Sequence, residues 1–136
     1  MDDDRGKIHF RNRVLQLRDF SGIRYNNITP TDLDFAIEYH DKKIIIGELK
    51  YDDAKLPEGQ RLLLERFVND FTMAGKSSIA FVGKHYVSDC TQDIIVAEVI
   101  VDEVYYKGEW KPNTKKCTVK RLCDWFLKGE IDNGTR

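Results

Sequence analysis

One short segment, KIIIGELKY at residues 43–51, constrains the fold of this chain more than any other. Its three consecutive isoleucines are typical of a buried strand, and the segment closes with a carboxylate and an amine, Glu48 and Lys50. Because side chains alternate across a strand, Glu48 and Lys50 point to the same side of the sheet. Ile44 and Ile46 share that side. The segment therefore predicts a core strand that brings two opposite charges together where the strand ends.

The preceding segment, DLDFAIEYH at residues 32–40, alternates apolar and polar residues and is predicted to be the hairpin partner of that strand. The connecting residues are polar and too few for anything but a turn. A tight two-residue turn usually carries Asn-Gly or Asp-Gly, and neither pair occurs at this turn. We therefore expect a three-residue loop at residues 40–42.

Loop length decides which groups meet across the hairpin, because a slip of one residue moves every side chain to the other face. With the three-residue loop, Asp34 lies opposite Glu48. The same loop places Asp32 opposite Lys50. A two-residue loop would instead place Asp34 opposite Leu49, on the wrong face. The longer loop thus makes the charged groups converge.

Two carboxylates that face each other across a hairpin suit a hard divalent cation, because Mg²⁺ often takes only one or two such ligands and keeps several waters. Asp34 and Glu48 meet that need. Lys50 would lie beside the same metal, where it can orient the attacking water, help to deprotonate it and offset charge growing on a phosphate. The hairpin therefore predicts a site for Mg²⁺ or Mn²⁺ and a phosphate.

Helical periodicity occurs three times along the chain. A short amphipathic helix is predicted at about residues 10–18, a stronger one after Pro57, and a closing one at residues 118–129. Gln60 falls on the inward side of the second helix, near its start. The apolar stripes are Phe10, Val14 and Leu17 in the first helix, Leu63, Leu64, Phe67, Val68 and Phe71 in the second, and Val119, Leu122, Trp125 and Phe126 in the third.

Two further strands are predicted, SSIAFVG at residues 77–83 and the longer DIIVAEVIVDEVYY at residues 93–106. With the hairpin and the helices they give an α/β fold, a mixed sheet of about four to five strands flanked by helices. A length of 136 residues suits one compact domain, so we expect a single domain over residues 1–136.

The segment TDLDFAIEYHDKKIIIGELK resembles the PD-(D/E)XK nuclease superfamily, whose hairpin carries an Asp and, roughly a dozen residues later, a Glu-x-Lys. Asp34, Glu48 and Lys50 match these positions. The following segment, ELKYDDAKLPEGQRLLLERF, looks like the virus-type replication-repair branch and the Holliday-junction-resolvase-like phage nucleases, where a Gln opens the next helix. Gln60 matches that Gln. The resemblance covers about residues 10–83.

The resemblance implies a restriction-endonuclease-like core of the order αβββαβ and a Mg²⁺- or Mn²⁺-dependent endo- or exonuclease that hydrolyses phosphodiester bonds in DNA. It implies that Asp34 and Glu48 bind metal, that Lys50 serves the water and that Gln60 orients the water or the phosphate. A phage or mobile-element origin, action in the host cytoplasm and a homodimer are also implied. A structure-selective DNA substrate, such as a junction or a flap, fits the same resemblance.

Two departures from the family pattern leave alternatives open. Many members place a Glu on the first helix as another ligand, whereas this chain offers Asn12, Gln16 or Asp19 there. Leu33 rather than Pro precedes Asp34, so Asp32 is an alternative ligand, although Asp34 lies deeper in the strand. The competing hypothesis is a nuclease fold with little or no catalysis that binds nucleic acid or a host protein, for example as an inhibitor of a host defence protein.

Any contact with nucleic acid must come from local patches, because the net charge is only -1. Trp110 precedes one basic stretch and could stack a base. The acidic N-terminal MDDDRGK and the lack of an 18-residue apolar run predict neither a signal peptide nor a membrane span, and so a cytoplasmic protein. The candidate nucleic-acid-binding residues are Arg11, Arg13, Lys111, Lys115, Lys116, Lys120 and Arg121.

Overall fold

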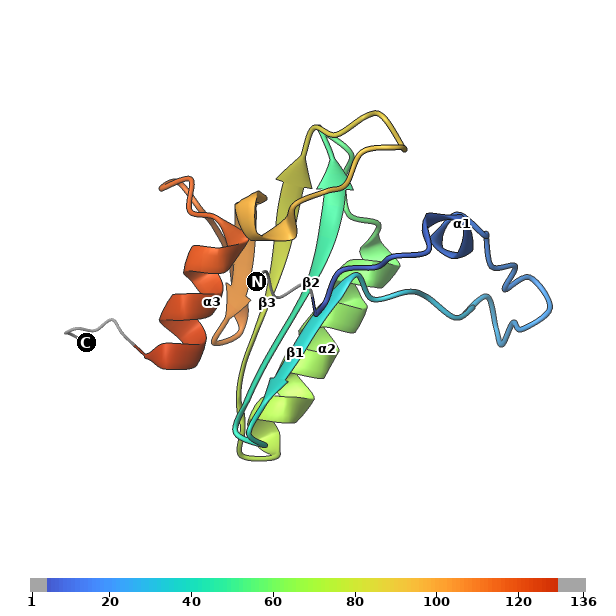
Figure 1. The fold of residues 1–136 in the computed structure, drawn as a ribbon. Helices are drawn as coiled ribbons and strands as arrows, with labels where there is room; N and C mark the ends of the chain where they lie inside the picture. Colours follow the sequence, from blue (N-terminus) through green and yellow to red (C-terminus); the bar gives the residue numbers. More distant parts are fainter. Residues whose placement is uncertain (1–4, 130–136) are drawn as a thin grey trace. The chain divides into compact units, whose positions relative to one another are not determined.

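The structure is a computed structural model that describes residues 5–129, without the side chains of Arg13 and Val14. Contacts divide the chain into two units, Met1–Asp32 and Leu33–Arg136, and each unit is described by itself. Figure 1 shows the course of the chain. One domain over the whole chain stays a prediction.

The described part of the first unit contains little regular structure. Its helix α1 spans only Arg11–Val14, and a single isolated bridge joins Tyr25 and Ile28. The prediction of a helix over residues 10–18 was therefore wrong in length. Phe10 is 70% exposed and Leu17 98% exposed, so these two apolar residues gain no burial that would hold a longer helix.

The second unit is built on a five-stranded mixed sheet, which confirms the predicted α/β class. The strands lie in chain order, and of the four neighbouring pairs only β2 with β3 is parallel. Helix α2, Glu58–Met73, forms the crossover between these two strands, and helix α3, Val119–Lys128, follows the last strand. The strands are β1 Phe35–Tyr39, β2 Lys43–Tyr51, β3 Ser77–His85, β4 Ile100–Tyr106 and β5 Glu109–Pro112.

The hairpin of β1 and β2 has the predicted register. Phe35 pairs with Gly47 and Tyr39 pairs with Lys43, which leaves the predicted three-residue loop between the strands. His40 in this loop has a φ of 54°, and the next residue has a φ of 61°, so the chain turns through the left-handed region without glycine. Continued by one residue, this register places Asp34 opposite Glu48, as expected for the three-residue loop.

The two helices cover opposite faces of the sheet and create two apolar cores (Figure 1). Alternation along β2 sends Ile45 toward the α3 core, and it sends Ile44 and Ile46 toward the α2 core. Glu48 and Lys50 follow Ile44 and Ile46, so they lie on the α2 face. The α2 core is Ile44, Ile46, Leu56, Leu64, Val68, Ala80, Val82 and Tyr105, and the α3 core is Ile45, Ile79, Phe81, Val99, Val101, Val119, Leu122, Cys123 and Phe126.

The predicted long strand at residues 93–106 was wrong in its first half. Val96–Glu98 forms a short 3-10 helix, η1, and β4 begins only at Ile100. Strand β3 explains this boundary, because its register with β4 ends where Lys84 pairs with Ile100. Residues before Val99 therefore have no strand to pair with in this register, because β3 ends at His85. The short edge strand β5 was not predicted.

The closing helix has the predicted position and standard caps. The Thr118 side chain accepts a hydrogen bond from the backbone N–H of Arg121, and Gly129 ends the helix in the left-handed region. Two strands rather than three precede α2, so the described element order differs from αβββαβ.

Within residues 5–129, no helix is long and apolar enough to cross a membrane.

Candidate functional site

Asp34 and Glu48 face each other at one end of the hairpin. Asp34 lies just before β1, and its Oδ2 accepts a hydrogen bond from the backbone N–H of Leu49 at 2.9 Å. Glu48 lies in β2 between two paired strands and is only 3% exposed. The exposed Asp34 thus places its carboxyl group beside a buried one.

Burial raises the pKa of Glu48 to about 8, and a hydrogen bond with the Asp34 side chain and the negative charge of Asp34 act in the same direction. A hydrogen bond from the Asp34 backbone and the charge of Lys50 oppose the rise but do not cancel it. At neutral pH Glu48 therefore keeps its proton. A divalent cation can take the place of that proton, since metal ligands bind in their deprotonated form. The donor set fits Mg²⁺ or Mn²⁺, which prefer carboxylate oxygen.

Gly47 explains how the strand can present Glu48 and still pack its other face. A Cβ at this position would lie 2.4 Å from the ring of Phe81, which is fully buried. The missing side chain lets Phe81 lie edge-on against Phe35, with ring centroids 5.1 Å apart. Phe35 is the residue that follows Asp34. Gly47 therefore lets β2 pack closely on Phe81, which in turn contacts the residue beside Asp34.

Lys50 has a cationic neighbour that the sequence did not indicate. In the parallel register of β2 and β3, Lys50 pairs with Lys84, one position beyond the predicted end of that strand. Nζ of Lys84 lies 3.9 Å from Asp53 and 3.7 Å from Asp102. If the strand predicted at residues 77–83 had been extended by one residue, its alternation would have placed Lys84 on the face opposite Phe81, which is the α2 face. Both lysines are half-buried at the carboxylate end of the sheet.

Gln60 lies in the first turn of α2, as predicted. The helix begins at Glu58 after Pro57, and the side-chain oxygen of Gln60 is buried. Because α2 packs on the face that carries Glu48, Gln60 belongs to the element that covers the site. The structure therefore places Gln60 on the expected helix and the expected side of the sheet.

The alternative ligand Asp32 belongs to the first unit. Its Oδ2 lies 2.7 Å from a guanidinium nitrogen of Arg18, and both side chains are largely exposed. Asn12 is an exposed residue of α1 in the same unit, and Gln16 is exposed as well. Asp19 accepts a backbone hydrogen bond from Ser21, which lowers the pKa of Asp19. Across the described residues, no three His, Cys, Asp or Glu side chains gather into one potential metal site.

The predicted basic stretch is exposed but spread over three elements. Lys111 lies on β5, Lys115 and Lys116 in the next loop, and Arg121 on α3. Lys120 forms an ion pair with Asp124 at 2.6 Å. The loop lies at the same end of the sheet as Lys84, because Lys84 pairs with Ile100 and Ile100 bridges to Thr118 (Figure 1).

Trp110 does not serve as the exposed stacking platform suggested by the sequence. Its Nε1 donates a hydrogen bond to Glu65 at 2.7 Å, and the guanidinium of Arg61 lies 4.6 Å from its ring centroid. Tyr105 packs against it with ring centroids 5.2 Å apart. These contacts hold β5 to α2, so Trp110 acts in packing.

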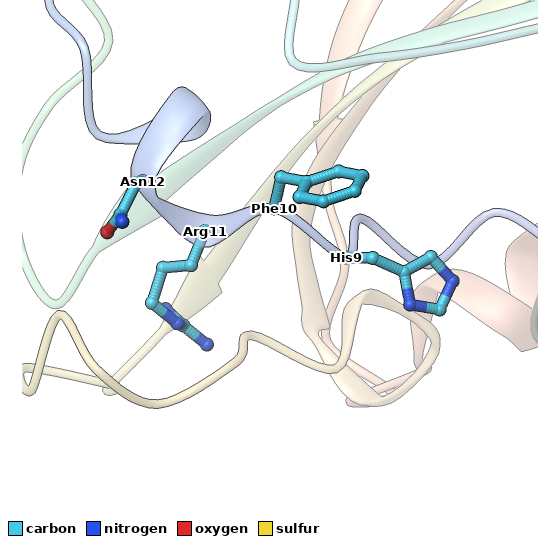
Figure 2. A pocket seen from close by; sticks show the side chains of 4 residues that line it. All are labelled: His9, Phe10, Arg11 and Asn12. Carbon is cyan, nitrogen blue, oxygen red and sulfur yellow. The ribbon is translucent and has the colours of Figure 1, made fainter.

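The basic residues of the first unit lie on and around α1. Figure 2 shows His9, Phe10, Arg11 and Asn12, which line a hollow of about 350 Å³ and point in different directions. Arg11 is exposed there. The side chain of Arg13 lies outside the described part of the chain, so its predicted contact with nucleic acid stays a prediction.

Comparison with protein families, with curated proteins and with solved structures found no match for this chain.

Proposed function

We propose that the protein is a metal-dependent nuclease that hydrolyses phosphodiester bonds in DNA, with the hairpin of β1 and β2 as its catalytic element. The observation that carries the proposal is the buried Glu48, which is paired with Asp34 and lies two positions before Lys50 on one sheet face. An apolar strand gains nothing from such a group, because burying a carboxyl group costs free energy. The PD-(D/E)XK resemblance of the hairpin and of the start of α2 belongs to the same proposal, with two strands rather than three before that helix.

In this proposal Asp34 and Glu48 would hold Mg²⁺ or Mn²⁺. The bound ion would supply Lewis-acid stabilisation of the phosphate and lower the pKa of a coordinated water. The hydrogen bond from Leu49 keeps the Asp34 carboxylate in place. Glu48 would bind the ion in its deprotonated form, so metal loading would add a second negative charge to that of Asp34.

Lys50 and Gln60 complete the proposed site. Lys50 is half-buried on the face of Glu48, where an ammonium group offsets negative charge that grows on the phosphate during attack. Gln60, at the start of α2, offers an amide that can orient the water or a phosphate oxygen. Neither residue needs to bind the metal, which agrees with a site of two carboxylates.

The test compares wild-type protein with Glu48→Gln, which keeps the size of the side chain and removes its charge. Supercoiled, linear, single-stranded and four-way-junction DNA are each incubated with EDTA, Mg²⁺ or Mn²⁺. The matched control is Glu38→Gln, an exposed glutamate in β1 of the same hairpin. We expect metal-dependent cutting by wild type and by the control, and its loss in Glu48→Gln.

Cutting that persists in a pure Glu48→Gln preparation would exclude Glu48 as a ligand. If folded wild-type protein cuts none of the four DNA forms, the chain is better described as a binding module on a nuclease-like scaffold. The observation that favours this second function is that, among the described residues, no third His, Cys, Asp or Glu side chain joins Asp34 and Glu48 as a further metal ligand. Binding to DNA or to a host protein without a divalent ion would then support it.

A further inference from the structure

Lys84 adds a second positive charge beside the proposed nuclease site. It pairs with Lys50 across the parallel strands β3 and β2, and neighbouring strands lie about 4.8 Å apart. Residues paired in this way project to the same face, so Lys84 lies on the α2 face with Glu48 and Lys50. Two lysines at paired positions on one face concentrate positive charge there, and such charge favours the binding of an anion.

The contacts that Lys84 makes are long. Its Nζ lies 3.9 Å from Asp53 and 3.7 Å from Asp102, whereas charge-assisted hydrogen bonds measure about 2.7–2.9 Å. The Asp53 side chain is 92% exposed, and exposed ion pairs of this kind contribute little. Lys84 is therefore held near its position by weak partners that a phosphate group can replace.

Lys84 also connects the carboxylate pair to the basic loop. Along this end of the sheet, Lys50 on β2 is followed by Lys84 on β3 and then by Ile100 at the start of β4. Ile100 bridges to Thr118, which directly follows the loop that contains the exposed Lys115 and Lys116. Positive side chains thus occur on β2, on β3 and, past the apolar Ile100 of β4, in the loop, an arrangement that can follow a chain of phosphates.

We propose that Lys84 binds a backbone phosphate of the DNA strand, next to the phosphate that is attacked, and leads the strand from Asp34 and Glu48 toward the loop with Lys115 and Lys116. This inference rests on the proposed function, because it takes DNA as the ligand. Lys84 is a binding residue here and takes no part in activating water.

The experiment measures DNA binding by fluorescence anisotropy of a labelled oligonucleotide, single-stranded and duplex, in EDTA over a range of salt concentrations. Lys84→Gln should raise Kd by about three- to tenfold for every sequence, and it should lower the salt slope by about one. Lys84→Arg should bind like wild type. Asp53→Asn removes a competing carboxylate and should bind DNA more tightly. The matched control is Lys42→Gln, an exposed lysine in the hairpin loop at the other end of β2.

Unchanged Kd and salt slope in Lys84→Gln would overturn the inference, as would an equal loss in Lys42→Gln. Melting temperatures identify variants that fail to fold, and Asp53→Asn still tests the proposal in that case. Cleavage is measured separately with Mn²⁺. If the protein cuts DNA but Lys84→Gln binds DNA like wild type, the nuclease proposal holds and the role of Lys84 is excluded. If binding depends on Lys84 but no DNA is cut, Lys84 is a DNA-binding residue and the nuclease proposal is excluded.

Discussion

The backbone N–H of Leu49 donates a 2.9 Å hydrogen bond to the Asp34 side chain. This contact continues the hairpin beyond its last paired residues and aims Asp34 at Glu48. Asp34→Asn keeps an oxygen that can accept the bond but loses the charge, so we expect near-wild-type stability without metal and no stabilisation by Mn²⁺. Asp34→Ala loses the acceptor as well and should cost about 1–2 kcal/mol more. Melting temperatures with EDTA and with Mn²⁺ test both, and Mn²⁺ stabilisation of Asp34→Asn would contradict the assignment.

Glu48 should make stability depend on pH in an unusual direction. Its pKa rises from 4.5 to about 8 on folding, so the native state holds a proton that the unfolded state releases. The stability contributed by the protonated group is complete below pH 4.5 and is lost as the pH rises through about 8. Glu48→Gln removes this loss, and its free energy of unfolding should exceed that of wild type by roughly 2 kcal/mol or more at pH 8.5.

Urea unfolding of wild type and Glu48→Gln in EDTA at pH 5 and pH 8.5 measures this effect, with Glu38→Gln as the control. A difference that stays constant between the two pH values would show that Glu48 is ionised throughout. Saturating Mn²⁺ should reduce the difference at the higher pH, because a bound cation stabilises only the native wild type.

Gly47→Ala should be strongly destabilising. The added Cβ would meet the ring of the buried Phe81 at 2.4 Å, a contact that forces the ring or the strand to shift. Overpacking of this kind costs about 1–3 kcal/mol. Gly59→Ala is the matched control, since a Cβ there meets nothing within 4 Å and alanine favours the helix. Chemical denaturation should give opposite signs for the two variants, and equal effects would exclude the steric explanation.

Arg61 should stabilise the attachment of α2 to the far strands of the sheet. Its guanidinium makes two hydrogen bonds to Glu103, at 2.7 and 3.3 Å, and also lies over the ring of Trp110. Arg61→Ala leaves a half-buried carboxylate without this partner and should cost about 1–3 kcal/mol. Arg66→Ala, at an exposed position of the same helix, should change stability by less than about 0.5 kcal/mol. Equal losses in the two variants would contradict a specific role.

The central part of the fold could be predicted because its signals are local and agree with one another. Strand β2 was predicted with its exact bounds, and the absence of a tight-turn pair gave the correct register, Phe35 with Gly47. That register alone brings Asp34 to Glu48. In contrast, no local sequence pattern predicts that Lys84 is a neighbour of Lys50, because the register of a parallel pair depends on how the crossover helix aligns the two strands.

The errors arose where tertiary partners decide the outcome. The apolar run before Ile100 looks like strand, but β3 ends its pairing there and the chain forms η1 instead. Helix α1 is shorter than its periodicity suggests, because Phe10 and Leu17 stay exposed. The sequence alone could not say whether the ring of Trp110 faces solvent or packs against the protein. In the structure Trp110 packs against α2 and donates a hydrogen bond to Glu65.

The agreement between strand order and chain order has a consequence for biosynthesis. Each strand joins the edge of the sheet that the previous strand has just formed, so no later segment must insert between earlier ones. Asp34, Glu48, Lys50 and Lys84 all precede β4 in the chain, so they are synthesised before β4, β5 and α3. Because chains emerge from the N-terminal end, the hairpin of β1 and β2 leaves the ribosome first, and the later strands can add to its edge in the order in which they appear.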